Sequence, residues 1–141
     1  MKTVTIDQAK LNSVKTLYVG SHSPDGKMCL MEAEAYVHNR PWSDRDEDIC
    51  PVLGTYGRTL NDQMPDTERV RLLQFLGGLM GTRSTWGVEQ KRTFLFADYA
   101  VRRFAPVAMR ALNREDLAVR LEAVPQIVDT ASAIVGRDVA R

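Results

Sequence analysis

Two prolines constrain this chain more than any other feature, because each lies at the edge of a segment with helical spacing. Pro41 follows the segment 28–38, and Pro51 opens the segment 51–64. The residue before a proline is pushed out of the helical region, and a proline inside a helix removes one hydrogen bond. At the first helical position proline is favoured, because no N–H is needed there. The sequence therefore predicts a helix, a tight corner over 39–50 and a second helix that starts at Pro51.

Both segments carry residues three or four positions apart, the spacing of one helix face. These positions are Met28, Met31, Ala35 and His38 in the first segment and Leu53, Tyr56, Leu60 and Met64 in the second. Gly54 and Gly57 each lower helix propensity by about 1 kcal/mol relative to alanine, so we expect them to allow close packing against another helix. Asp46, Glu47 and Asp48 precede the second helix, and we expect them to face the positive end of its dipole.

Helical spacing continues through the rest of the chain. We expect further helices from Gln8 (capped by Asp7), over 67–80, over 88–112, over 113–123 and over 126–135. Pro106 lies inside the longest pattern, and we expect a kink or a break there. The sequence therefore predicts an all-α fold, a compact single-domain bundle of about five or six helices. It would consist of an N-terminal helix and loop (1–26), a helical core (27–135) and a polar tail (136–141).

The composition excludes several classes of protein. A chain of 141 residues can bury a core without disulfides or metal, and a formal net charge of +1 supports neither intrinsic disorder nor a strongly basic surface. There is no apolar run near the ~18 residues that span a bilayer, and the start of the chain lacks the apolar centre of a signal peptide. We therefore expect a cytoplasmic protein with no membrane contact, no cofactor and two buried free thiols, Cys29 and Cys50.

Residues that could do chemistry are few. Glu34 and His38 lie four positions apart on one helix face and are the candidate metal ligands, but helical carboxylate sites use a Glu-x-x-His motif from each of two helices. The chain has only 2 histidines, and we favour His38 as a residue that ends its helix. No nucleophile elbow, phosphate-binding glycine loop, dinucleotide fingerprint or Cys-x-x-Cys pair is present. We lean against an enzyme and keep a small metal- or thiol-dependent enzyme as an alternative.

Positive charge gathers in the later half of the chain, around the expected helix 88–114. Aromatic residues lie between the basic ones, an arrangement that can meet nucleic-acid phosphates or an acidic protein. A solvated helix face with local ion pairs explains the same pattern. If nucleic acid is the partner, we expect contacts from Arg83, Lys91, Arg92, Arg103 and Arg110. Asp98 and Arg102, four positions apart near the apolar stripe, predict a partly buried structural ion pair.

Several short motifs of the chain are distinctive in combination. They are Cys29-Leu30-Met31-Glu32-Ala33, Ala35-Tyr36-Val37, Pro41-Trp42-Ser43-Asp44, Cys50-Pro51-Val52-Leu53, Arg58-Thr59-Leu60-Asn61-Asp62, Gly81-Thr82-Arg83, Asp98-Tyr99-Ala100-Val101-Arg102 and Phe104-Ala105-Pro106. Over residues 20–128 the chain thereby resembles an uncharacterised family of small proteins of bacteriophages, prophages and bacteria, notably actinobacteria. The family often has Ser-Asp-His-Pro at the corner, where this chain has Ser43-Asp44-Arg45-Asp46, so no role of that histidine is carried over. The resemblance implies a phage or bacterial origin but no activity.

The expected function combines this resemblance with the corner. We expect a phage or prophage accessory protein that binds a macromolecular partner, in the first place a protein, and the resemblance to phage-borne proteins implies a host or defence component. Exposed aromatic and arginine residues dominate interface energetics, so Trp42, Asp44 and Arg45 are the expected contact residues. If Trp42 is buried, it plugs the core instead. Nucleic acid is the alternative partner, and the oligomeric state is open, with a homodimer as one alternative.

Overall fold

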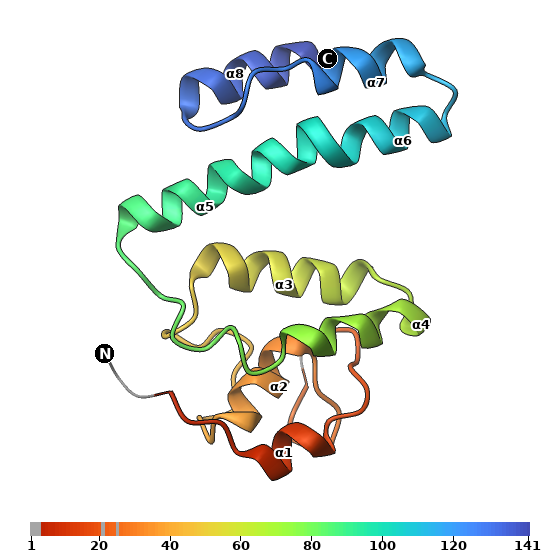
Figure 1. Ribbon diagram of the computed structural model, residues 1–141. Coiled ribbons are helices and arrows are strands. Elements are labelled where there is room, and N and C mark those ends of the chain that lie inside the picture. The colour runs from red at the N-terminus through yellow and green to blue at the C-terminus, as the bar shows by residue number, and fades with distance from the viewer. Residues whose placement is uncertain (1–3, 21, 25) are drawn as a thin grey trace. The chain divides into compact units, whose positions relative to one another are not determined.

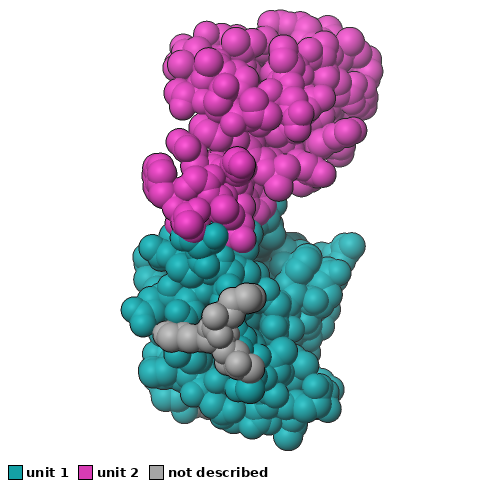
Figure 2. All heavy atoms as spheres, turned by 60° about the vertical axis from the view of Figure 1, so that its left-hand side comes forward, with its two compact units in different colours: residues 1–84 teal, residues 85–141 magenta. Residues whose placement is uncertain are grey.

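All regular secondary structure in the described part of the chain is helical. The computed structural model describes residues 4–20, 22–24 and 26–141 (Figure 1), and the absence of strands from these residues confirms the predicted all-α class. None of the described helices has the length and apolar character needed to cross a membrane. Contacts divide the chain into two compact units, residues 1–84 (unit 1) and 85–141 (unit 2), which Figure 2 colours separately. The prediction of a single domain stays a prediction.

The described residues of unit 1 form four helical rods. They are α1 (Gln8–Ser13), α2 (Leu30–Val37), α3 (Pro51–Gln63) and α4 (Asp66–Arg69), the last continued by the 3-10 helix η1 (Val70–Phe75). Two of the helix starts agree with the sequence prediction. The side chain of Asp7 accepts a hydrogen bond from the N–H of Lys10 (3.1 Å), and Pro51 is the first residue of α3. Local capping chemistry therefore sets these two boundaries.

Helix α2 is the centre of unit 1. Seven of its 8 residues are buried, including Glu32 and Glu34, so α2 is enclosed on all sides. Helix α3 packs on it through Gly57, where a Cβ atom would lie only 2.9 Å from Cε of Met31. The close packing predicted for this glycine is therefore confirmed. The core around α2 consists of Val14, Leu17, Cys29, Leu30, Met31, Ala33, Val37, Ile49, Leu72 and Met80.

The prediction of one helix over 67–80 is wrong for the second half of that range. The α4–η1 rod ends at Phe75, and Gly77 and Gly81 have positive φ values of 86° and 78°, which break the helical path. Backbone N–H groups of the 77–80 loop donate instead to the carboxylate of Glu34. A buried acceptor on another helix therefore overrides the local helical preference.

Unit 2 begins with one long rod that changes its hydrogen-bond pattern midway. Helix α5 (Trp86–Tyr99), the π-helical turn η2 (Ala100–Phe104) and α6 (Ala105–Ala111) follow one another without a break. Pro106 is the second residue of α6 and has no N–H to donate to the preceding turn. The wider π turn directly before it accommodates this loss. The irregularity predicted near Pro106 is therefore present as a π turn in a continuous rod.

Helices α7 (Glu115–Glu122) and α8 (Thr130–Val139) complete unit 2. Helices α6 and α7 form a hairpin, and its turn holds Asn113 with a positive φ of 58° (Figure 1). The last helix lies later than the expected 126–135, and most of the expected tail is helical, because Asp129 caps α8 by accepting the N–H of Ser132 (2.8 Å). The buried residues that α6, α7, α8 and the α7–α8 loop contribute are Pro106, Ala118, Leu121, Val124, Ile127 and Gly136.

Candidate functional site

The predicted corner between α2 and α3 is a well-bonded connection. Asn39 follows the last turn of α2 with a positive φ of 55°. Its N–H donates to the carbonyl of Tyr36 (3.2 Å), and the N–H of Arg40 donates to the carbonyl of Ala35 (2.9 Å). These two bonds form a Schellman motif, which satisfies carbonyl groups at a helix end. His38 is the C-cap residue of α2, as predicted. The chain therefore leaves α2 in one fixed direction.

Arg40 holds the corner together from one side. Its Nε donates to Oδ2 of Asp46 (2.9 Å), and its Nη2 lies 3.0 Å from Oδ2 of Asp48. The hydrogen bond that Arg40 donates to Asp46 and the charge of that carboxylate raise the pKa of Arg40 above its ordinary value. The N–H of Asp48 also donates to Oδ1 of Asp46 (2.9 Å). Asp46 and Asp48 therefore stabilise the corner through bonds within it. From the sequence we expected them only to face the positive end of the α3 dipole.

Trp42 is half-buried and fixes the corner to a second loop. Its Nε1–H donates to the backbone carbonyl of His22 (2.7 Å). The backbone N–H of His22 donates in turn to Glu32 of α2, and Nδ1 of His22 lies 3.0 Å from the other oxygen of that carboxylate. Trp42 is therefore neither the exposed anchor nor the core plug considered from the sequence. Its indole N–H connects the corner to the loop that contains His22.

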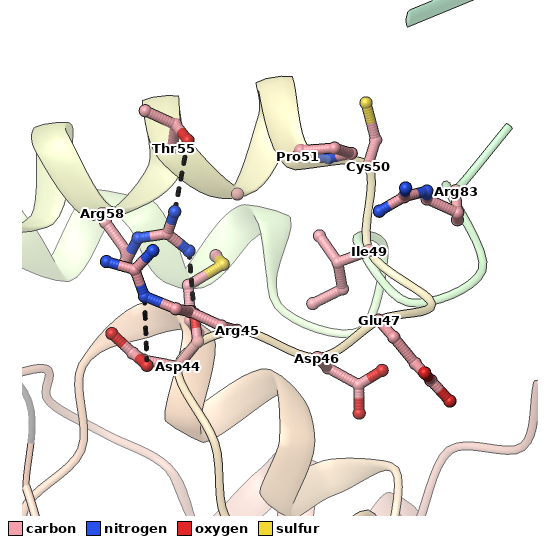
Figure 3. A pocket seen from close by; sticks show the side chains of 12 residues that line it. Asp44, Arg45, Asp46, Glu47, Ile49, Cys50, Pro51, Thr55, Arg58 and Arg83 are labelled. Atoms are coloured by element: carbon pink, nitrogen blue, oxygen red, sulfur yellow. Dashed lines mark hydrogen bonds and ion pairs between the residues drawn. The ribbon is translucent and has the colours of Figure 1, made fainter. Parts of the chain in front are cut away.

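Asp44 and Arg45 lie where the corner reaches solvent. The side chain of Arg45 is 76% exposed, and its Nε lies 4.0 Å from the carboxylate of Asp44. From α3, Nη1 of Arg58 donates to the backbone carbonyl of Asp44 (2.9 Å), and Nη2 donates to the hydroxyl oxygen of Thr55 (3.2 Å). Two arginines from different elements therefore meet at Asp44, as Figure 3 shows.

Two cavities adjoin this place on unit 1. The smaller has a volume of about 230 Å³ and the larger about 540 Å³. Both are lined by four residues that we call the corner surface, namely Asp44, Arg45, Thr55 and Arg58. In the smaller cavity Ile49 and Arg83 lie across from the arginines of the corner surface (Figure 3). The corner therefore places two arginines and Asp44 beside cavities large enough for side chains of a partner.

Glu34 and His38, the candidate metal ligands, are buried and form hydrogen bonds that join three segments of unit 1. The carboxylate of Glu34 accepts three N–H groups of the 77–80 loop at 2.6, 2.9 and 2.7 Å, so both of its oxygens are occupied. Nε2 of His38 lies 3.2 Å from Glu34, and Nδ1 lies 2.8 Å from the carbonyl of Thr5. No group of at least 3 His, Cys, Asp or Glu side chains that could hold a metal occurs in residues 4–20, 22–24 and 26–141. The pair is better explained as a connection between α2, the 77–80 loop and the start of the chain.

Glu32 is the second buried carboxylate of α2. One of its oxygens accepts the N–H of Cys29 (2.8 Å), in addition to the two contacts with His22. Burial acts to raise the pKa of Glu32, but the N–H groups of His22 and Cys29 outweigh burial and hold the pKa below its ordinary value. Burial raises the pKa of the Cys29 thiol to about 12, so this thiol stays protonated at neutral pH. Cys29 and Cys50 are both free and buried, as predicted.

The basic residues named for nucleic-acid binding do not gather on one element. Arg83 belongs to unit 1 and the other four to unit 2. Arg110 is bound to two carboxylates, with Nη2 at 3.0 Å from Glu115 and Nη1 at 2.6 Å from Glu122. These contacts correspond to the local ion pairs that explain the basic pattern without nucleic acid. The α5–η2 rod carries the remaining three, Lys91, Arg92 and Arg103.

Comparisons with known proteins leave the site to be judged from its own geometry. No family model, no curated protein and no solved structure matches this chain. The resemblance to small phage and bacterial proteins therefore stays a prediction.

Sequence reasoning did not single out Arg58 and Thr55 as site residues, although a signal was available. Arg58 falls off the apolar stripe of the helix that Pro51 starts, so its side chain was expected outside the core. What the sequence did not show is that the corner returns along α3 and brings Asp44 to within 2.9 Å of Arg58. The buried roles of Glu32 and Glu34 were also missed. Their signal was the position of two carboxylates inside a run of Leu, Met and Ala.

Proposed function

We propose that this protein is a phage or prophage accessory protein that binds a protein partner through the corner surface of unit 1. Asp44 and Arg45 are kept from the sequence prediction, and Thr55 and Arg58 are added to them. Trp42 supports the corner through its hydrogen bond to the carbonyl of His22. The identity of the partner as a host or defence component of the cytoplasm rests on the resemblance of the short motifs to phage-borne proteins.

The main support for the proposal is a highly exposed arginine in a corner whose backbone is held by several hydrogen bonds. Arg45 is 76% exposed, and the corner that bears it is fixed by the Schellman motif, by Arg40 and by Trp42. A surface that is already ordered loses little conformational freedom when a partner binds. Arginine is also among the residues that contribute most at protein interfaces. Exposure and rigidity together favour a binding surface over a passive loop.

Binding is favoured over catalysis because two reactive groups of unit 1, Glu34 and Cys29, are not available to act on a substrate. Glu34 uses both oxygens on the 77–80 loop, and the Cys29 thiol keeps its proton at neutral pH. A general base or a nucleophile needs an available lone pair within reach of its substrate. Nucleic-acid binding has less support than protein binding, because Arg110 already pairs with Glu115 and Glu122.

Affinity capture with matched variants tests the proposal. Tagged protein is incubated with lysate of a bacterium that carries the gene, and captured proteins are identified by mass spectrometry for wild type, Arg45→Glu and Arg71→Glu. Arg71 is the control because its side chain is 71% exposed and lies in η1 of the same unit. We expect a partner whose recovery falls about tenfold or more with Arg45→Glu, a loss of about 1.4 kcal/mol, and changes little with Arg71→Glu.

Folding of both variants is checked by Trp42 fluorescence in a Trp86→Phe background. If the Arg45→Glu and Arg71→Glu proteins recover every captured protein as well as wild type does, the corner surface is not the binding site. Equal loss with both variants would point to general electrostatic attraction and would also contradict the proposal.

A further inference from the structure

We infer that the corner surface recognises a carboxylate side chain of its partner, set next to an aliphatic side chain in a short acidic segment. This rests on the proposed function, since it names the partner's chemistry at the same surface. Some charged groups around the two cavities are already paired, and others remain available to a partner.

Two of the four acidic side chains that line the cavities, Asp46 and Asp62, are bonded to groups other than the arginines of the corner surface. In the smaller cavity, Asp46 accepts hydrogen bonds from Arg40 at 2.9 and 3.2 Å, and Arg40 does not line that cavity. In the larger cavity, Asp62 accepts the N–H of Gly20 (2.9 Å) and an amide N–H of Asn61 (3.0 Å). The N–H of Gly20 is the main reason that the pKa of Asp62 lies below its ordinary value. These carboxylates therefore do little to neutralise the arginines of the corner surface.

Donors of the corner surface remain available. Arg45 has one ion-pair contact, at 4.0 Å to Asp44, which is too long for a hydrogen bond. Arg58 gives one bond from each terminal nitrogen, to the carbonyl of Asp44 and to Thr55, and these two bonds fix the plane of its guanidinium. The other N–H groups of that guanidinium have no acceptor among the described residues, and a carboxylate can accept two parallel N–H groups from a guanidinium.

The surroundings favour a singly charged anion over a doubly charged one. Asp44 touches Arg45, and Glu47 also lines the smaller cavity. Three acidic and three basic side chains line the smaller cavity, so the second charge of a dianion gains little extra attraction there, whereas removing that charge from water adds a cost. A carboxylate of Asp or Glu carries one charge, whereas a phosphate monoester carries nearly two at neutral pH. The corner surface therefore suits a carboxylate better than a phosphate.

The smaller cavity also supplies apolar contact. Met31, Ile49 and Pro51 line it together with the arginines, and Figure 3 shows Ile49 between Arg83 and the Arg45–Arg58 side. With about 230 Å³ in one cavity and about 540 Å³ in the other, the corner surface can receive two neighbouring side chains of an extended segment. One side chain would be acidic and the other aliphatic.

Selection from a random peptide library tests this chemistry and does not require the natural partner to be identified first. A displayed library of unmodified ten-residue peptides is selected on the wild-type chain at about 50 mM salt, where surface charges are weakly screened. Enriched peptides are synthesised, and their dissociation constants are measured by fluorescence anisotropy. We expect enriched peptides in which Asp or Glu stands beside Leu, Ile or Val. Binding should weaken about tenfold or more when the acidic residue becomes Gln or when the protein carries Arg45→Glu.

A charge exchange separates recognition from damage to the fold. Peptides with Lys in place of the acidic residue should bind the Arg45→Glu protein better than they bind wild type, which a merely misfolded variant would not do. Arg71→Glu should leave all affinities within about twofold of wild type. A phosphoserine version of the enriched peptide should bind more weakly than its glutamate version. Tighter binding of the phosphopeptide would overturn the choice of a carboxylate.

The outcomes distinguish this inference from the proposed function. Enriched peptides that lack acidic residues but still lose binding with Arg45→Glu would overturn the inference and leave the corner surface as a binding site. Failure to enrich any peptide that depends on Arg45 would overturn the inference as well. In that case the capture experiment with lysate decides the proposed function independently, because a folded partner does not require a linear segment.

Discussion

The two units of this chain are held together by different means. Unit 1 buries Glu32, Glu34, Asn61 and Arg69, and each of them bonds to backbone groups of other segments. In unit 2 the buried residues of α6, α7 and α8 are apolar or glycine, whereas the two buried residues of α5, Glu89 and Asp98, are acidic. Asp98 bonds to the backbone of the α7–α8 loop. The difference follows the lengths of the helices. Unit 1 connects short helices by long irregular loops, whereas unit 2 is mostly continuous helix.

Irregular backbone needs partners that helices supply for themselves. Nearly every buried N–H group in a native protein is paired, and outside a helix the partner has to come from elsewhere. In unit 1 carboxylates and amides of the central helices provide it. Asn61 of α3, for example, accepts the N–H of Leu30 (3.1 Å) and donates to the carbonyl of Tyr18 (2.8 Å). The buried polar groups of unit 1 therefore specify where its loops lie, and the corner surface depends on them.

Removing the carboxylate of Glu34 tests the role of buried polar groups in unit 1. Of the changes considered, it should have the largest effect on the free energy of unfolding. Glu34→Ala leaves three N–H groups of the 77–80 loop without their acceptor. A buried donor without a partner costs about 1–3 kcal/mol, so we expect the free energy of unfolding of unit 1 to fall by about 3 kcal/mol or more. Urea unfolding followed by Trp42 fluorescence in a Trp86→Phe background measures it. Glu34→Gln, which keeps one acceptor oxygen, should lose less.

Hydrogen exchange shows whether the damage stays in unit 1. Amide protection of α7 should be unchanged in the Glu34→Gln protein, because Asp98 and the apolar core of unit 2 are untouched. Equal loss of protection in both units would mean that they unfold together. That result would support the predicted single domain and would contradict the contrast between the two units.

Asp98 is the corresponding group of unit 2 and should matter less. It accepts the N–H of Ile127 (2.9 Å) and lies 3.0 Å from Nη1 of Arg102, which confirms the predicted partly buried pair. We expect Asp98→Ala to lower the stability of unit 2 by about 2 kcal/mol, since one buried N–H and one partly buried guanidinium lose their acceptor. Faster hydrogen exchange at Ile127, with α2 unaffected, would verify this. A loss as large as that from Glu34→Ala would contradict the view that apolar packing dominates unit 2.

Acid should weaken unit 1 through Glu32, to a smaller extent. Burial raises the pKa of Glu32, but N–H donors hold it below the ordinary value of 4.5 in the folded chain. The unfolded chain therefore binds this proton more readily, and stability that is present above pH 4.5 is lost as pH falls through the folded pKa. Unfolding midpoints in urea from about pH 7 to about pH 3 measure the loss. In Glu32→Gln the decline below pH 4.5 should be shallower, and an unchanged decline would assign acid sensitivity to other carboxylates.

How far the sequence predicts this structure depends on whether a segment is bonded locally. Pro51 and Asp7 set helix starts through their own backbone chemistry, and both were predicted. The 77–80 loop was mistaken for helix because its partner, Glu34, lies 43 to 46 positions away along the chain. The same holds for the candidate site. Arg45 was named from its position in the corner, whereas Arg58 joins it only through a contact that folding creates.

Alanine at two helical glycines gives the smallest effects and compares the packing of the units directly. A Cβ at Gly57 in unit 1 would meet Cε of Met31 at 2.9 Å, and a Cβ at Gly136 in unit 2 would meet Cδ1 of Ile127 at 2.9 Å. Alanine favours a helix by about 0.5–1 kcal/mol over glycine. The flexible methionine can move aside, whereas the β-branched isoleucine is held more stiffly. We therefore expect Gly57→Ala to change urea stability by less than about 0.5 kcal/mol, and Gly136→Ala to destabilise by about 1 kcal/mol. The reverse order would show that α3 packs on α2 less tolerantly than α8 packs in unit 2.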